Sequence, residues 1–209
     1  MRKRNLMILL TIVIFIPISV WIFQIRNGYV PLVDQWTIKL VEGYAGTPLY
    51  YFAFAITQLG SRQFLIPFVL IASVILALIY KHLLPPFIFA GGTLFSYFIN
   101  GFIKDIIPRE RPSIIVAANA VGGSFPSGHA MISMVCYGLL AFFITRKVKV
   151  HSISIIIQVS LSLLVFLIGI SRFIINAHYL TDVLAGFGIG FILLICYIYL
   201  YEKLFPKES

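Results

Sequence analysis

Charged residues are scarce in this chain of 209 residues: they make up 11% of it, against 60% hydrophobic residues. A soluble domain is usually about one quarter charged and about half apolar. The composition therefore excludes an ordinary soluble protein and indicates a membrane protein. Cysteine is scarce too, and Cys136 and Cys196 each lie inside an apolar run. This placement argues against a disulfide framework and suits small core residues.

Acidic residues are also few, and the formal net charge is +9. A basic protein can bind nucleic acid, but here the cations lie at the ends of apolar runs, with no basic stripe within a polar surface. We therefore expect the bilayer as a partner and no nucleic acid. The N-terminal stretch MRKRNLMILLTIVIFIPISVWIF lacks the short apolar region and small-residue exit of a cleaved signal peptide. It is interpreted as a retained signal-anchor helix.

Six apolar stretches have the length of about 20 residues that a spanning helix needs. They lie at residues 5–25, 62–80, 85–105, 129–146, 152–171 and 180–201. The predicted fold class is all-α: a polytopic membrane protein with six transmembrane helices, forming one domain over residues 1–209. After the first span, PLVDQWTIKLVEGY has apolar residues at helical spacing among Asp34, Lys39 and Glu42, which favours an interfacial amphipathic helix. The sequence leaves open whether residues 49–60 re-enter the bilayer.

The distribution of lysine and arginine predicts the orientation in the cell membrane. If the N-terminus is cytoplasmic, the short basic clusters MRKR and RKVKVH both face the cytoplasm, which is the usual side for such clusters. Both termini then lie in the cytoplasm, and the 105–128 loop and the 172–179 turn face the outside. His82 and His151 fall on the cytoplasmic side and are interpreted as interfacial histidines.

The first polar stretch on the outer side is KDIIPRERP, residues 104–112. Lys104 lies in the last turn of an otherwise apolar helix, and Pro108 then breaks the helix and turns the chain. Arg111 can therefore fold back toward Lys104, and two converging cations need an anionic partner. The alternative is a solvated loop whose cations reach the headgroup level.

The second stretch, residues 126–129, is PSGH at the start of an apolar run. We expect Pro126 in the first turn of the helix, with the N–H groups of Ser127, Gly128 and His129 unpaired at the helix start. Such an end binds phosphate well, and Gly128 lets a ligand approach the backbone closely. The alternative is a plain helix cap with an exposed histidine.

The third stretch is SRFIINAHYLTD, residues 171–182. His178 and Asp182 are four residues apart and share one helix face. The carboxylate can bind one ring N–H of the imidazole, which fixes the tautomer and leaves the other nitrogen free to attack. Arg172 adds a third cation, and the alternative is one surface His–Asp pair. Two histidines and an aspartate could hold zinc, but three cations suit an anion better, so we expect no metal and no cofactor.

Together the three stretches form the pattern Lys-x6-Arg-Pro, Pro-Ser-Gly-His and Ser-Arg-x5-His-x3-Asp. The pattern, its order and the six-helix layout resemble the type 2 phosphatidic acid phosphatase superfamily of membrane lipid phosphatases. The resemblance implies metal-independent hydrolysis of a lipid phosphate monoester or diphosphate. It implies that His178 is the nucleophile and forms a phosphohistidine, that Asp182 orients it, and that His129 protonates the leaving oxygen. It also implies a phosphate-binding set: Lys104, Arg111, Ser127, Gly128 and Arg172.

Two positions depart from many members of that superfamily: Ile174 stands where an aromatic residue is common, and Asn176 where glycine is common. Gly128 is the common form, whereas a subgroup associated with undecaprenyl diphosphate often has aspartate there. The resemblance therefore favours phosphatidylglycerophosphate, as for bacterial phosphatidylglycerophosphatase B-like members, or a broad range that includes phosphatidic acid and undecaprenyl diphosphate. The lipid tail, the choice between monophosphate and diphosphate, and the oligomeric state stay open.

A different class of function is a non-enzymatic transporter for an anion or a lipid, because ionisable residues inside a membrane can line a pathway. Transporters place such residues near the bilayer midplane on broken helices, whereas here they gather at one surface. Vanadium haloperoxidases have motifs that resemble these. They are soluble proteins, however, and the six apolar stretches argue against a soluble protein.

Overall fold

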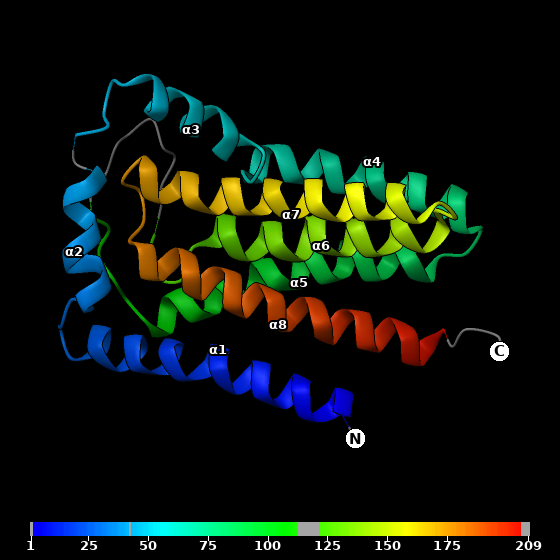
Figure 1. The fold of residues 1–209 in the computed structure, drawn as a ribbon, viewed down its shortest axis with the longest axis horizontal. Helices are drawn as coiled ribbons and strands as arrows, with labels where there is room; N and C mark the ends of the chain where they lie inside the picture. Colours follow the sequence, from blue (N-terminus) through cyan, green and yellow to red (C-terminus); the bar gives the residue numbers. More distant parts are fainter. Residues whose placement is uncertain (1, 42, 113–121, 206–209) are drawn as a thin grey trace.

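A computed structural model describes residues 2–41, 43–112 and 122–205 of the chain, with the side chains of residues 2–8 and 10 left out of the description. These ranges are helical and contain no strand (Figure 1). Their helices are α1 (Arg2–Arg26), α2 (Leu32–Val41), α3 (Pro48–Gln58), α4 (Arg62–Tyr80), α5 (Leu84–Ile106), α6 (Gly128–Lys147), α7 (His151–Ile174) and α8 (Leu180–Leu204).

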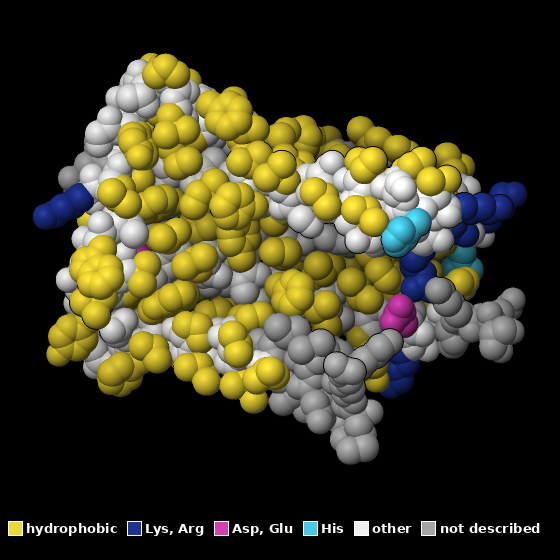
Figure 2. Space-filling model, in the orientation of Figure 1, with side chains coloured by type: hydrophobic (Ala, Val, Ile, Leu, Met, Phe, Trp, Pro, Cys, Tyr) yellow, Lys and Arg dark blue, Asp and Glu magenta, His cyan; other side chains and the backbone are white. Residues whose placement is uncertain are grey.

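Five of the described helices, α4 to α8, are long and apolar enough to cross a membrane. In α1 the described apolar part is shorter, Thr11–Arg26. The expected all-α membrane layout is therefore confirmed as five candidate spans and a shorter apolar helix. Figure 2 shows the consequence for the surface, because hydrophobic side chains cover the face between the two ends of the bundle. Such a surface suits contact with lipid chains.

Helix α6 is the centre of the bundle and packs against α5, α7 and α8. Its buried side chains Val135, Leu139 and Phe143 belong to the main core, which Phe89 of α5 and Ile168 of α7 complete. Because α6 carries the second motif, this packing holds that motif between the helices that carry the other two.

Helices α6 and α8 approach each other closely because α8 presents glycines at the contact. A Cβ atom added at Gly186 would lie 2.6 Å from the carbonyl oxygen of Ser127, and one added at Gly190 would lie 2.6 Å from that of Met131. Small residues at such spacing let two membrane helices touch backbone to backbone. This contact places the start of α8 directly against the start of α6.

Helices α2 and α3 lie at the end of the bundle where α8 begins (Figure 1). Helix α2 falls within the stretch expected to be amphipathic, but its buried residues are Asp34 and Val41, whereas Leu32, Trp36 and Leu40 are exposed. The apolar face of α2 therefore points away from the protein, toward where headgroups would lie. Helix α3 packs along α7 and ends in a turn that leads into α4.

Candidate active site

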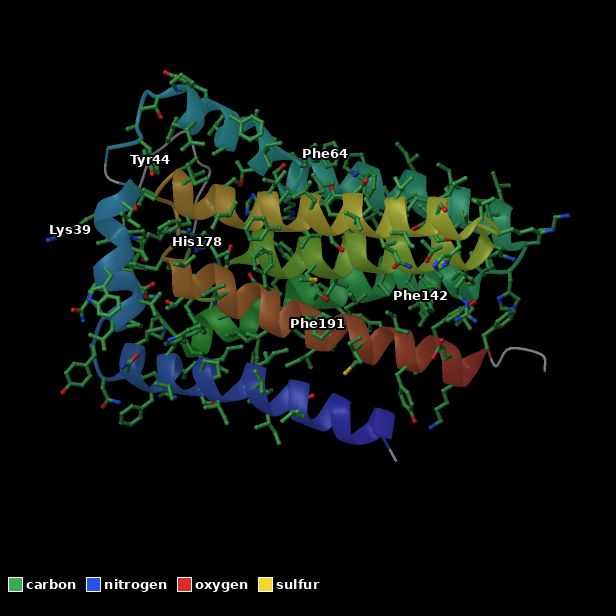
Figure 3. The ribbon with its side chains drawn as sticks, viewed as in Figure 1. Lys39, Tyr44, Phe64, Phe142, His178 and Phe191 are labelled. Atoms are coloured by element: carbon green, nitrogen blue, oxygen red, sulfur yellow. The ribbon has the colours of Figure 1, made fainter. Side chains whose placement is uncertain are left out.

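The three polar stretches meet at the end of the bundle that α2 covers, around a pocket of about 540 Å³. His178 lies inside this end of the bundle, whereas Lys39 of α2 points away from it (Figure 3). Asp182 and Ser127 are buried beside the pocket. Of the eight sequence-predicted site residues, the pocket lining includes Lys104, Arg111, Gly128, His129, Arg172 and His178.

The turn between α7 and α8 positions His178. The N–H groups of Ala177 and His178 both donate to the carbonyl oxygen of Arg172, at 3.0 and 3.2 Å, which closes the end of α7. Asn176 adopts φ +55° in this turn. Asparagine is tolerated in this left-handed conformation, in which glycine is the usual residue. Asn176, in place of the common glycine, therefore preserves the turn and the direction of His178.

The two ring nitrogens of His178 have different partners. Nε2 lies 3.0 Å from Nη1 of Arg111. Because a guanidinium can only donate, Nε2 is the acceptor and Nδ1 carries the proton. Nδ1 in turn faces Oδ2 of Asp182 at 3.5 Å and Oγ of Ser124 at 3.3 Å. In this tautomer the lone pair lies on Nε2, the nitrogen that faces Arg111.

Asp182 is completely buried and is held from several sides. Its Oδ2 accepts hydrogen bonds from the backbone N–H of Tyr179, at 2.9 Å, and from the hydroxyl of Ser124. Its Oδ1 accepts from Nη1 of Arg109 at 2.6 Å. Ser124 thus links Asp182 to His178, and no sequence signal marked it, because its part depends on a contact across 58 residues.

Burial keeps the nucleophile candidate neutral. It lowers the pKa of His178 to about 3, although the hydrogen bond and charge of Asp182 oppose that shift. Burial also lowers the pKa of Arg111. Desolvation disfavours the charged form of such groups. At neutral pH the imidazole of His178 is therefore uncharged and able to act as a nucleophile.

Four cations line the pocket: the three predicted ones and Arg62 at the start of α4. Lys104 donates to the carbonyl oxygen of Gly123, and Nη2 of Arg111 donates to the same oxygen at 3.2 Å. The chain therefore folds back after Pro108, as expected. Arg172 is almost completely buried, and its Nη1 donates to Oγ1 of Thr57 at 3.1 Å. Among the described residues that line the pocket none is acidic, so its field favours an anion.

The second motif differs from its expected geometry. Helix α6 begins at Gly128 with Ser127 as its N-cap, so Pro126 precedes the helix and does not lie in its first turn. The N–H of Ser127 was expected to be unpaired. It instead donates to the carbonyl oxygen of Asp182 at 2.9 Å. The reason is the close approach of α8, which the sequence pattern did not reveal. Gly128 and His129 at the start of α6 still line the pocket.

Close packing against Asn100 also favours glycine at position 128. A Cβ atom there would lie 2.9 Å from Oδ1 of Asn100, whose Nδ2 donates to the carbonyl oxygen of Pro126 at 3.3 Å. The hydroxyl of Ser127 is buried and has no hydrogen-bond partner within the described part of the chain. A buried polar atom without a partner is rare, and Ser127 directly precedes Gly128, which lines the pocket.

His129 is half-buried and lines the pocket from the first turn of α6. Across the described ranges its imidazole makes no hydrogen bond within the protein. The same ranges contain no group of three or more His, Cys, Asp or Glu side chains that could hold a metal ion.

Two further charged residues belong to the site. Arg109 bridges Asp182 and Asp34, and its Nη2 lies 2.7 Å from Oδ2 of Asp34. Sequence reasoning placed Arg109 on the outer side without a role and assigned Asp34 to an amphipathic pattern. Their pairing joins residues 75 positions apart, and helical periodicity carries no information about such a contact.

The comparisons with known proteins agree with this geometry. A profile of the PAP2 superfamily matches residues 85–206, more than half of the chain. Phosphatidylglycerophosphatase B of Bacillus subtilis (strain 168) is 31% identical over 142 residues, which cover 66% of this chain and 68% of that protein. A PA-phosphatase related-family protein of Dictyostelium discoideum is 33% identical over 92 residues, 41% of this chain and 25% of that protein.

A solved structure has the same fold. The crystal structure of a transmembrane PAP2 type phosphatidylglycerolphosphate phosphatase from Bacillus subtilis matches with a TM-score of 0.82, covering 95% of this chain and 98% of that chain at 22% sequence identity. This match supports a multi-pass membrane protein. The chain therefore belongs to the PAP2 superfamily, as its three motifs predicted, and is a membrane phosphatase of that superfamily.

Proposed function

We propose that this protein hydrolyses a lipid phosphate monoester or diphosphate through a phosphohistidine at His178. The observation that carries the proposal is the shape of the pocket, which joins a cationic end to an apolar one. The polar end holds His129, His178 and the cations, and the rest is lined by apolar side chains of α4 and α5, among them Leu65, Ile66, Val69, Leu70, Leu94 and Phe98. A headgroup phosphate fits the first part and a lipid chain the second.

The first chemical step follows from the two nitrogens of His178. Nε2 attacks phosphorus and forms a P–N bond, while the P–O bond to the lipid breaks on the opposite side. The ring then carries positive charge, which Asp182 stabilises through Nδ1–H. His129 gives its proton to the leaving oxygen as general acid. The products of this step are the dephosphorylated lipid and a phosphohistidine.

The second step returns the enzyme to its starting state. His129, now neutral, takes a proton from a water molecule, and the water oxygen attacks phosphorus as the P–N bond breaks. Inorganic phosphate leaves and Nε2 regains its lone pair. In both steps Lys104, Arg111 and Arg172 stabilise the charge on the phosphoryl oxygens, with the Ser127 hydroxyl and Gly128 amide as further donors. No metal ion is required in this scheme.

The proposed substrate preference rests on the relatives and on position 128. The Bacillus subtilis relative is a phosphatidylglycerophosphatase, and glycine at position 128 is the common form of the motif. We infer phosphatidylglycerophosphate as the first candidate, with phosphatidic acid and undecaprenyl diphosphate as the alternatives.

The proposed orientation places the site outside the cytoplasm and both termini inside. The beginning of α1 and the end of α8 lie on the side away from the pocket (Figure 1). On the face that Figure 2 shows, lysine, arginine and histidine gather at that same far end, where Arg146 and Lys147 end α6. Basic clusters favour the cytoplasmic side, and this supports the orientation.

The test is phosphate release from the three lipids by purified protein in detergent that contains EDTA. We expect release from at least one lipid phosphate, unchanged by EDTA and blocked by vanadate, which can adopt the five-coordinate geometry of the transition state. No release from any of the three would contradict the proposed activity. Loss in EDTA with recovery on adding zinc would contradict the histidine mechanism.

A further inference from the structure

Arg109 is shared between two carboxylates that come from different helices. Its Nη1 lies 2.6 Å from Oδ1 of Asp182 at the start of α8, and its Nη2 lies 2.7 Å from Oδ2 of Asp34 on α2. The side chain of Arg109 is only 8% exposed and those of both aspartates are fully buried. The guanidinium also lies over the ring of Tyr179, 3.8 Å from its centre, so its plane is held.

The first helical turn of α8 holds Asp34 in place. Its Oδ1 accepts from the backbone N–H of Thr181 at 3.0 Å, and its Oδ2 accepts from the Thr181 hydroxyl at 2.5 Å. A buried carboxylate is tolerated only when it is paired and hydrogen-bonded, and both conditions are met here. Asp34 therefore binds the same helical turn that carries Asp182.

We propose that Asp34 is a positioning residue for the reaction, an inference that rests on the proposed function. A guanidinium with one carboxylate partner tends to bind both of its oxygens. Asp34 occupies Nη2 of Arg109 and thereby restricts Arg109 to Oδ1 of Asp182. Oδ2, which also accepts from the Tyr179 N–H and the Ser124 hydroxyl, then carries no guanidinium nitrogen and faces Nδ1–H of His178 at 3.5 Å. Without Asp34, Arg109 would take both oxygens, and the imidazolium formed on attack would lose part of its support.

The alternative is that Asp34 is only a structural contact between two helices. It would hold α2 against α8, and its loss would lower stability without changing the chemistry of folded molecules. The two roles differ in what they require of residue 34. A positioning role requires a negative charge at residue 34, whereas a buried structural contact requires a side chain of the right size.

The test compares Asp34→Asn with Asp34→Glu in purified, folded, full-length protein. In Asp34→Asn we expect kcat for the lipid phosphate to fall roughly ten- to hundredfold, by analogy with residues that orient the ligands of a metal site. KM should not change, because the cations that bind phosphate are untouched. Asp34→Glu keeps the charge, so its kcat should lie between those of Asp34→Asn and the wild type.

A purely structural role leaves the kcat of folded protein unchanged in both variants and lowers stability instead, more in Asp34→Glu than in Asp34→Asn, because asparagine has the size of aspartate and glutamate does not. Asp105→Asn is the matched control, since Asp105 is an exposed aspartate at the same end of the bundle, and it should keep the wild-type kcat. Arg109→Lys keeps one charge but loses the forked donor, and it should also lower kcat. The double variant should be no slower than the slower single variant if both act through the same bridge.

The outcomes separate this inference from the activity itself. An active wild type with equal kcat in Asp34→Asn overturns the role of Asp34 only, as do losses that add up in the double variant. If Asp34→Asn does not fold, a wild-type kcat in Arg109→Lys overturns the role as well. A wild type that releases phosphate from none of the lipids overturns the proposed function, and the role of Asp34 with it.

Discussion

His178 meets two opposite requirements. In the proposed reaction it must be neutral to attack phosphorus, and the site must then stabilise the positive charge that the ring acquires. Burial meets the first requirement by lowering its pKa to about 3. Asp182 meets the second, because its Oδ2 lies 3.5 Å from Nδ1. The same carboxylate is kept in place by Ser124 and Arg109, so the reactivity of one histidine depends on a network around it.

The pKa of His178 makes the stability of the protein depend on pH. An unfolded histidine titrates near 6.5, so between pH 6.5 and about 3 the unfolded chain binds a proton that folded His178 does not. Protonation therefore favours unfolding in this window, and the stabilisation present above pH 6.5 is lost as the pH falls. We expect the thermal stability of wild-type protein in detergent to fall from pH 6.5 to 4, and that of His178→Gln to fall less. Equal pH dependence in the two proteins would contradict this.

Among the helices, α6 and α8 are the pair on which the site depends most. α6 carries His129, α8 carries Asp182, and the glycines of α8 allow their backbones to touch. The N–H of Ser127 bonds to the carbonyl oxygen of Asp182 across this contact. The distance between the helices therefore sets the relation between the two motifs.

Gly190→Ala should disrupt this contact. Its new Cβ would lie 2.6 Å from the carbonyl oxygen of Met131, and backbone cannot move aside as a side chain can. Overpacking of this kind typically costs about 1–3 kcal/mol, so we expect a lower melting temperature and lower activity. Gly91→Ala in α5 is the control, because a Cβ there meets nothing within 4 Å. A Gly190→Ala protein as stable and active as the control would show that the close approach is not needed.

The helices of the bundle could be predicted from the sequence because each long apolar run ends in charged residues or proline. The helices expected at 62–80 and 85–105 correspond to α4 (Arg62–Tyr80) and α5 (Leu84–Ile106) in the structure. The convergence of the three motifs could be predicted too, since it follows from the number of crossings between them. What could not be predicted were Asp34, Arg109 and Ser124, because their contacts depend on how distant helices pack.

At the scale of the whole molecule, the bundle has one polar end with the pocket and one end with basic clusters. This polarity gives the proposed orientation a direct test. Cysteine introduced at Arg62, which lines the pocket at the start of α4, should react with an impermeant thiol reagent added to intact cells. Cysteine introduced at Lys149, at the opposite end, should react only after lysis. Reversed labelling would mean that the site faces the cytoplasm.

The covalent intermediate is the central claim, and a variant of His129 offers the way to observe it. p-Nitrophenyl phosphate has a leaving group that needs no proton, so His129→Ala should still form the phosphohistidine. The same variant lacks the base proposed to activate water for the second step. The phosphoenzyme should therefore accumulate, with a burst of about one p-nitrophenol per enzyme molecule.

The deciding measurement is mass spectrometry of the His129→Ala protein after reaction with p-nitrophenyl phosphate, with His129→Ala/His178→Ala as the control. We predict a phosphoryl group on His178 in the first protein, lost in acid as expected for a phosphohistidine, and no phosphoryl group in the second. A phosphoryl group on another residue, or the same burst in the protein that lacks His178, would contradict the account.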